Sequence, residues 1–277
     1  MKRKLKSMLA SLCCTVLLVS GLTACSKPDT STAQNAATGE TTDSKGDKDM
    51  NKNDINKNDT GKTVIKAIST SSTYPNNSYM IISKSGTVLV ADPYMVTSGI
   101  KPDIITSTHS HPDHNDQAFY DKNKGVKTSL YKVESFSFKD IKVSSIASTH
   151  GDTINKDNPS NVIYVYEVDG LRIAHMGDIA QDQLTDEQVK ALGKIDIAFM
   201  QFVNSYSDYS LENGKGFKLI EQLKPQIIIP THSSPEATKK IGDIVGKYEK
   251  VENVLSISKD DLKDGTRKVI EIKNTLK

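Results

Sequence analysis

The stretch His109-Ser110-His111-Pro112-Asp113-His114 holds three of the six histidines of the chain. The other three, His150, His175 and His232, each follow a short apolar run that then turns polar. Neutral imidazole and carboxylate are the ligands that suit zinc and related divalent ions. Because scattered core or surface histidines would not segregate in this way, the pattern predicts a metal-binding site.

The apolar runs around these histidines predict strands that end together. The stretches 104–109, 146–150 and 228–232 each finish with Thr-His, and 173–178 finishes with His-Met-Gly-Asp. Strands of one sheet can end at a common edge, where a rigid scaffold holds their terminal side chains. The four stretches are therefore expected to bring their histidines and Asp178 to one point.

The spacing within 109–114 predicts two ligand sets. In extended chain, residues two apart point the same way, so His109 and His111 can bind one ion while Asp113 and His114 face a second. Asp178 has two carboxylate oxygens and can bridge both ions. The predicted sets are His109, His111, His150 and Asp178 around the first ion, and Asp113, His114, His232 and Asp178 around the second.

The rest of the chain from Thr63 onward predicts many short strands and few helices. Lys84-Ser85-Gly86 and Asp169-Gly170 are typical of hairpin turns. Thr185 begins a helix through a capping box, and Gly193 ends it. Further helices are expected over 115–121, 216–223 and 237–251, and the remaining strands over 64–68, 78–83, 87–91, 126–131, 135–138, 141–147, 162–168, 171–175, 195–200, 227–229, 254–257 and 268–272.

The N-terminus is typical of a bacterial lipoprotein. Four basic residues within positions 1–6 precede an uncharged apolar stretch, which ends Leu22-Thr23-Ala24-Cys25. Residues 1–24 are therefore interpreted as a signal peptide, with Cys25 as the lipidated new N-terminus. The alternative is an uncleaved anchor, but the stretch is short for a span of about 20 residues. This interpretation predicts attachment to the extracytoplasmic face of the bacterial membrane.

Residues 25–62 are expected to be a tether. They are rich in Thr, Ser, Asn, Asp, Lys and Gly, and they contain almost no large apolar side chain. Such a segment cannot offset its ordering entropy by burial, so it should be disordered and solvated. Cys13 and Cys14 leave with the signal and Cys25 is lipidated, so no cysteine remains as nucleophile or metal ligand.

Residues 63–277 are long enough for one domain with a substantial core. The chain carries 36 basic and 34 acidic side chains, and removal of the basic signal leaves it close to neutral. It therefore lacks the basic stripe that nucleic-acid binding requires.

The order of these motifs resembles the metallo-β-lactamase superfamily over residues 63–277. Smaller matches resemble its ascorbate phosphate lactonase-like branch: 77–81 (Asn-Ser-Tyr-Met-Ile), 90–93 (Val-Ala-Asp-Pro), 175–178 and 223–225. The resemblance implies an α/β fold, the four-layer αββα sandwich, with two mixed sheets, helices outside and the metals at one edge. It also implies the ligand scheme given above. Because all of these ligands are nitrogen or oxygen donors, we expect two divalent ions, zinc first and manganese or iron as alternatives.

Four further residues have open roles. Asp92, beside Pro93, is either a turn residue or one that orients a ligand, and His175 is expected to support ligands because the ligand sets are full. Contact with substrate is an alternative for both residues. Tyr206 and Tyr209 lie in the loop 202–215, which should overhang the metals. They either touch substrate or simply pack the loop.

A water held between two ions loses its proton near neutral pH, which predicts a bridging hydroxide as nucleophile. Asp113 and Asp178 are the candidate proton carriers. The expected substrate is a small ester, lactone or phosphodiester; the alternative is a non-catalytic metal- or ligand-binding lipoprotein that keeps the site. Relatives with other activities fit less well. Nucleases carry a long insertion before the last histidine, most antibiotic-cleaving β-lactamases have Cys in place of Asp178, and diiron relatives replace His111 with a carboxylate.

Overall fold

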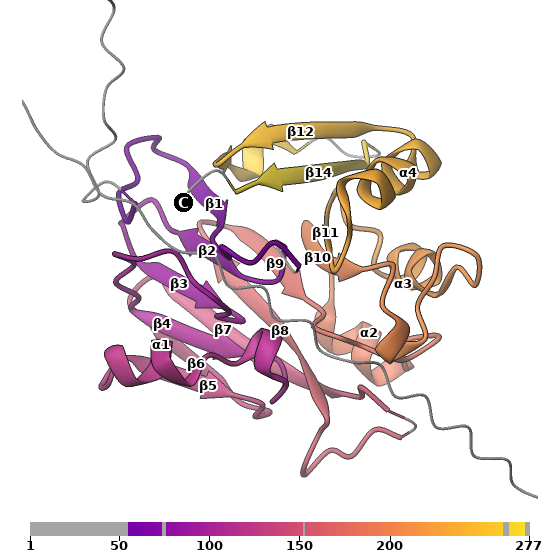
Figure 1. Cartoon of the computed structure of the whole chain (residues 1–277), viewed down its shortest axis with the longest axis horizontal. Coiled ribbons are helices and arrows are strands. Elements are labelled where there is room, and N and C mark those ends of the chain that lie inside the picture. Colours follow the sequence, from indigo (N-terminus) through magenta and orange to yellow (C-terminus); the bar gives the residue numbers. More distant parts are fainter. Residues whose placement is uncertain (1–54, 74–75, 152, 263–265, 275–277) are drawn as a thin grey trace, which may run out of the picture. The chain divides into compact units, whose positions relative to one another are not determined.

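The computed structural model describes residues 55–73, 76–151, 153–262 and 266–274 (Figure 1). The described residues belong to one compact unit. The expected signal peptide, Cys25 and the tether up to residue 54 lie outside them. Within the described part, no helix combines the length and apolar character that crossing a membrane demands.

Two sheets form the framework. Both are mixed, since each contains parallel and antiparallel strand pairs. The first sheet has the order β13 (Leu255–Ile257), β1 (Thr63–Ala67), β2 (Tyr79–Ile82), β3 (Val88–Ala91), β4 (Ile104–Ser107) and β5 (Lys127–Leu130). The second has the order β12 (Tyr248–Glu252), β14 (Lys268–Lys273), β11 (Ile227–Thr231), β10 (Ile197–Gln201), β9 (Leu171–His175), β8 (Asn161–Val168), β7 (Ile141–Ser148) and β6 (Ser135–Phe138).

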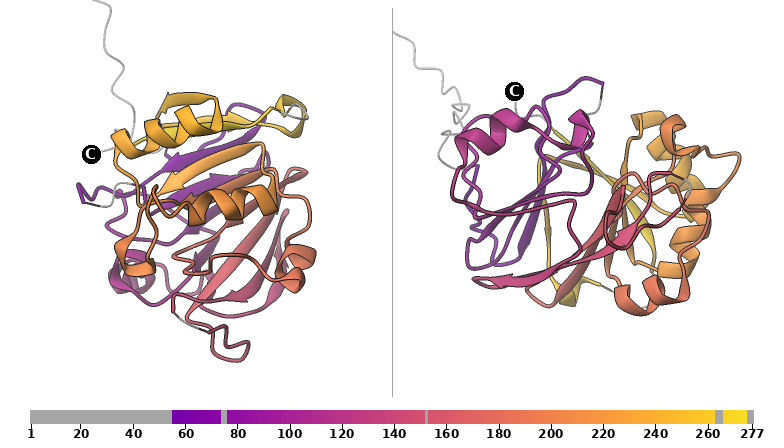
Figure 2. Two further views of the ribbon diagram at one scale, coloured as in Figure 1. Left: turned by 90° about the vertical axis from the view of Figure 1, so that its right-hand side faces the viewer. Right: turned by 90° about the horizontal axis from the view of Figure 1, so that it is seen from below.

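Helices cover the outer faces of both sheets. The short α1 (Gln117–Lys122) packs Phe119 against the first sheet. The second sheet is covered by α2 (Asp186–Leu192), α3 (Lys215–Leu223) and α4 (Pro235–Val245). Figure 2 (right) shows the magenta α1 on one side of the sheets and the orange helices on the other. The described part of the chain also contains short 3-10 turns at Pro112–His114, Ser205–Ser207 and Lys259–Asp261.

The core lies between the sheets, and alternation along the strands explains it. In β1 the fully buried Ile65 and Ala67 face the second sheet, whereas Val64 packs on the helical side. Tyr79 of the first sheet stacks on Phe199 of the second, with ring centroids 4.4 Å apart. Alternate side chains of each strand thus serve two layers. The four-layer αββα sandwich expected from the sequence is confirmed.

One predicted element is wrong. The helix expected over 237–251 is α4, which ends at Val245 and is followed by the strand β12. Gly246 takes a left-handed conformation (φ 105°) that ends the helix and reverses the chain. Tyr248 then crosses close over Gly242, where a Cβ would lie 2.5 Å from the Tyr248 Cβ. Residues 248–252 pair with β14 instead of continuing the helix.

The domain also begins earlier than expected. Residues 55–62 were assigned to the tether, yet Ile55 packs against the outer cluster of the first sheet. The Asn58 side chain donates to the carbonyl of Ser83 at 2.8 Å, and Lys62 pairs with Asp261. The expectation that nothing before Thr63 packs is therefore wrong for these eight residues, because polar side chains can dock by hydrogen bonds as well as by apolar burial.

Candidate metal centre

The ends of four strands meet at one edge of the two sheets. The 3-10 turn Pro112–His114 follows β4 of the first sheet, while His150, Asp178 and His232 follow β7, β9 and β11 of the second. The ligand atoms of three residue groups, each within 4.8 Å of one another, lie there: His109, His111 and His150; His109, His114 and Asp178; and Asp113, His114 and His232. The structure thus brings all seven expected ligands together.

The first ligand set has ligand atoms without a partner. His109 Nε2 and His150 Nε2 are buried, and no hydrogen-bond partner for them exists among the described residues. Buried polar atoms in native proteins are nearly always satisfied, so such a concentration requires an explanation. A divalent cation supplies it, since each atom is a lone-pair donor of the type that zinc binds. His111, which is exposed, lies at the rim of the same group.

The second ligand set has the spacing of a coordination sphere. His114 Nε2 lies 3.1 Å from His232 Nε2 and 3.7 Å from Asp113 Oδ2, and His232 Nε2 lies 3.6 Å from the same oxygen. Ligands about 2.0–2.2 Å from a tetrahedral ion are roughly 3.3–3.6 Å from one another. The residues present therefore fit a bound divalent ion.

Asp178 faces both ligand sets with different oxygens. Its Oδ1 lies 3.3 Å from His114 Nε2 and 3.4 Å from His232 Nε2. Its Oδ2 lies 3.4 Å from His150 Nε2 and 3.8 Å from His109 Nε2. Burial alone would raise the pKa of Asp178, but the charges of His114 and His232 outweigh it and hold that pKa well below the ordinary range. The carboxylate is therefore ionised, as a bridging ligand must be.

Glycine makes this placement of Asp178 possible. Gly177 has φ 56°, and a Cβ on it would lie 2.3 Å from the Asn161 side-chain oxygen. Only glycine allows the chain to turn so tightly between β9 and Asp178. His232 also has a positive φ, 49°, and it is not a glycine. Such backbone strain is often found at functional sites.

Asp92 lies beneath the ligands and orients them. Its carboxylate is fully buried and accepts hydrogen bonds from His114 Nδ1 at 2.7 Å, from His175 Nε2 at 2.8 Å, and from both the amide and hydroxyl of Thr108 at 2.7 Å. Burial raises its pKa, but the two imidazoles outweigh burial and lower the pKa overall. A carboxylate behind a ligating histidine fixes the ring and leaves the other nitrogen for the metal.

The same network sets the proton position on His109. The Thr108 hydroxyl donates to Asp92, so its oxygen accepts from His109 Nδ1, 3.0 Å away. The proton on Nδ1 leaves Nε2 of a neutral ring unprotonated. Burial, aided by the neighbouring His114, lowers the pKa of His109 to about 3, so the ring is neutral at physiological pH.

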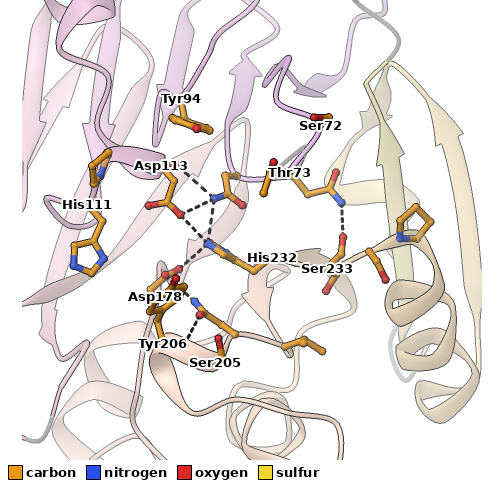
Figure 3. Close-up of a pocket in the computed structure, with 17 residues that line it drawn as sticks. Ser72, Thr73, Tyr94, His111, Asp113, Asp178, Ser205, Tyr206, His232 and Ser233 are labelled. Carbon is orange, nitrogen blue, oxygen red and sulfur yellow. Dashed lines mark hydrogen bonds and ion pairs between the residues drawn. The ribbon is translucent and has the colours of Figure 1, made fainter. Parts of the chain in front are cut away.

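A cleft of about 850 Å³ opens beside the second set. Figure 3 shows Asp113, Asp178 and His232 at its floor, with Tyr94 and Tyr206 on opposite walls. Outside the metal-binding residues its lining carries no charged side chain. Pro112, Val203 and Pro235 add apolar surface, and hydroxyl groups come from Ser72, Thr73, Tyr94, Ser205, Tyr206, Ser233 and Ser234. A smaller cavity of about 330 Å³, partly walled by Asn158, Pro159 and Ser160, adjoins the first set.

The two tyrosines of the loop after β10 have different environments. Tyr206 lines the cleft and is 81% exposed, so it is available to a ligand. Tyr209 is buried in the outer core, and its hydroxyl donates to the Gln181 carbonyl at 2.6 Å. A substrate role for Tyr209 is therefore wrong, and its function is to pack the loop. His175 holds Asp92 rather than a ligand set.

Two asparagines at the site received no role from the sequence. Asn77 Nδ2 lies 3.1 Å from His232 Nε2 and 3.4 Å from Asp113 Oδ2, and Asn204 Nδ2 donates to Asp178 Oδ2 at 2.8 Å. Asn204 lies in the loop 202–215, which was expected to overhang the metals, whereas Asn77 lies in the 77–81 motif, which was not expected at the site. Asparagine is also common in turns, so residue type alone gave no signal.

Comparison with known proteins agrees with this geometry. Residues 72–232, more than half of the chain, match the β-lactamase superfamily domain. A UPF0173 metal-dependent hydrolase of Thermoplasma acidophilum is 23% identical over 196 residues, covering 58% of this chain and 85% of its own length. One from Nanoarchaeum equitans is 27% identical over 184 residues, covering 57% and 81%.

Solved structures support the fold. A Thermotoga maritima protein, assigned to the Zn-dependent hydrolases of the metallo-β-lactamase superfamily, superposes with a TM-score of 0.56 at 18% identity, covering 76% of this chain and 100% of that one. The family domain spans every expected ligand from His109 to His232. The chain therefore belongs to the metallo-β-lactamase superfamily of metal-dependent hydrolases.

Proposed function

We propose that this protein is a two-metal hydrolase of a small ester, lactone or phosphodiester, anchored by lipid on Cys25 to the extracytoplasmic face of a bacterial membrane. The observation that carries the enzymatic part is Asp178, whose two oxygens face two separate groups of imidazoles. A single ion would use only one of those groups and would leave the other histidines buried without a cation.

The donor set favours zinc. All ligand atoms are nitrogen or oxygen, with imidazole in the majority, which suits zinc and also allows manganese or iron. When bound, two such ions supply a water nucleophile near neutral pH and polarise the oxygen of the group under attack.

The residues of the chain divide the remaining work. Asp113, whose side chain is 24% exposed at the cleft, is placed to carry a proton to the leaving group. Asp178 provides one carboxylate oxygen to each ligand set, and Asp92 fixes the orientation of the His114 ring. No cysteine is needed as a nucleophile, and every histidine side chain faces either a ligand set or Asp92.

The cleft supports a small substrate rather than a polymer. Its described lining includes no Lys or Arg side chain. Nucleic acids are held largely by cations along the phosphate backbone. The hydroxyl and amide groups of the walls instead suit hydrogen bonding to a compact, polar molecule.

The lipid anchor rests on the sequence around Cys25. The Leu22-Thr23-Ala24-Cys25 motif and the polar segment behind it are those of a tethered lipoprotein. Two or more acyl chains hold a protein stably on a bilayer where a single chain does not. The resemblance to ascorbate phosphate lactonase-like proteins makes lactones the first substrates to try.

The function is tested with purified protein loaded with zinc, manganese or iron. We expect two ions per chain by elemental analysis, and hydrolysis of p-nitrophenyl butyrate, bis(p-nitrophenyl) phosphate or simple lactones. Activity should vanish with a chelator, return with metal, and resist serine- and thiol-directed reagents.

Asp178→Asn is the diagnostic variant and Asp121→Asn, on an exposed helix surface, is its matched control. Asp178→Asn should lose activity and metal while Asp121→Asn keeps both. Fully active protein with one ion would refute the two-metal scheme. Protein that holds two ions but turns over no substrate in a broad screen would indicate a binding lipoprotein.

A further inference from the structure

Asn204 connects the centre to the cleft. It lies in the loop that follows β10 and is 7% exposed. Both protons of its amide nitrogen have acceptors, Asp178 Oδ2 and Gln201 Oε1, each 2.8 Å away. Its amide oxygen accepts from the backbone amide of Tyr206 at 3.0 Å. Every hydrogen-bonding atom of this side chain is thus used, and exchanging its oxygen and nitrogen would place an acceptor against two acceptors.

Further bonds tie the same loop to the turn that carries Asp178. The Ser207 hydroxyl donates to the Asp178 carbonyl at 3.1 Å, and the Tyr209 hydroxyl donates to the Gln181 carbonyl. Asn204 and Tyr209 also exchange backbone hydrogen bonds of 2.9 and 2.8 Å, which close the loop between them. The loop and the turn therefore form one hydrogen-bonded unit.

The other side of this unit faces the cleft. Val203, Ser205 and Tyr206 line it, and Val203 and Tyr206 are exposed. Figure 3 shows Ser205 and Tyr206 on the same side of the cleft, next to Asp178 at its floor. Residues adjacent to Asn204 are thus placed to meet a ligand, while Asn204 itself holds the carboxylate.

We propose that Asn204 is a positioning residue that fixes Asp178 between the two ligand sets and couples metal binding to the order of the cleft loop, residues 203–207. This inference rests on the proposed two-metal function. Without the Asn204 bond, Asp178 Oδ2 is free to rotate away from His150 and His109, and its other oxygen moves with it. Loss of Asn204 should therefore weaken both ligand sets together.

The first test measures zinc affinity by competition with a chromophoric chelator. Asn204→Ala and the isosteric Asn204→Asp should each lower affinity for both ions by about 10–100-fold, the usual effect of losing an outer partner of a ligand. Asn213→Ala is the matched control. Asn213 also bonds within this loop, donating to the Asp208 carbonyl at 2.7 Å, but it is exposed and has no recorded hydrogen bond to Asp178.

The second test reads the loop itself. The chain has no tryptophan, so Tyr206→Trp places a single fluorophore on the cleft wall. Zinc does not quench fluorescence by redox chemistry, because its d shell is full. Titration of zinc into metal-free Tyr206→Trp protein should change the emission up to two equivalents. The change should be lost in the Asn204→Ala background even at saturating zinc, and retained in the Asn213→Ala background.

Each result decides between the alternatives. Unchanged zinc affinity in both Asn204 variants, or the same emission change in all backgrounds, overturns the coupling while leaving the two-metal function intact. Tighter zinc binding by Asn204→Asp would make residue 204 a ligand instead. If wild-type protein binds fewer than two ions, the proposed function fails first. Thermal unfolding of the metal-free variants shows whether a loss of affinity reflects misfolding, and Asn204→Asp keeps the shape of the side chain if Asn204→Ala unfolds.

Discussion

At the scale of single residues, the two ligand sets share only Asp178. His150 lies near its Oδ2 and His232 near its Oδ1. In the proposed two-metal scheme, the two histidines would therefore bind separate ions within one small centre. Substitution of each histidine should therefore weaken the binding of a different ion.

His150→Ala should weaken mainly the first ion, and His232→Ala mainly the second. Titration of cobalt or zinc into each variant should show one site near wild-type affinity and one weakened site. One variant should lose the tighter metal-binding step of the titration, and the other variant should lose the weaker step. Equal loss of both ions in each variant would contradict two separate sets.

Asp92 is the residue whose role the sequence left open. Asp92→Asn keeps the shape but removes a charge that two imidazoles and Thr108 face. We expect about 10–100-fold weaker binding of the second ion, because the His114 ring is no longer held by a carboxylate. A calorimetric zinc titration measures this, with the exposed Asp121→Asn as control. Full affinity in Asp92→Asn would reduce Asp92 to a turn residue.

At the scale of elements, the turn after β9 is tightly constrained. Gly177 combines a positive φ with close approach to Asn161 and Thr108, whereas Gly170 has φ 83° and nothing near its missing Cβ. A comparison of alanine substitutions at the two glycines therefore separates the effect of backbone strain from the effect of steric crowding.

Gly170→Ala should cost about 1–2 kcal/mol of unfolding free energy through its left-handed backbone alone. Gly177→Ala should cost clearly more and also weaken metal binding, since the crowded turn moves Asp178. Urea unfolding of the metal-free proteins measures the first effect, and chelator competition the second. Equal costs for the two variants would show that crowding at Gly177 is relieved.

Local signals identified most elements. The capping box at Thr185 and the hairpin at Asp169-Gly170 both occur where expected. The error at α4 has a specific cause. Residues 248–252 are compatible with a helix, but they lie beside β14, and only the folded chain provides that partner. Pairing between distant segments cannot be read from a local pattern.

At the scale of the whole molecule, the metal centre joins the two sheets. Its ligands follow β4 of the first sheet and β7, β9 and β11 of the second. Metal that binds only the folded chain stabilises it, by about 4 kcal/mol at a thousandfold excess over Kd.

Zinc should therefore raise the melting temperature of metal-free protein, and a chelator should reverse the change. Calorimetry with and without excess zinc measures the shift. Asp178→Asn should show a much smaller shift than Asp121→Asn. A shift that survives the loss of Asp178 would place the stabilising ion elsewhere.

The N-terminal boundary gives the last prediction. Deleting 26–54 should leave stability unchanged, whereas deleting 26–62 should lower it by about 1–3 kcal/mol, because Asn58 and Ile55 contact the first sheet. Urea unfolding compares the two deletion variants.

The proposed lipid anchor is tested separately. Cys25→Ser should move the protein from the membrane fraction to the soluble one, and a variant that stays membrane-bound would refute lipid anchoring.

The sequence by itself indicated the fold family and the seven candidate ligands that the structure brings together. The apolar runs that end in Thr-His specify strands with ligands at their ends, and a strand buries or exposes its side chains by a simple period of two. Those signals are local, so they can be recognised from the sequence alone.

Only the tertiary structure decided how the site is organised. It placed each oxygen of Asp178 on a different ligand set, put Asp92 beneath His114 and His175, buried Tyr209, and connected Asn204 to the bridge. These relations join residues far apart in the chain. Which partner a polar side chain finds depends on packing between the sheets and on the need to satisfy every buried polar atom, and neither is encoded at one position.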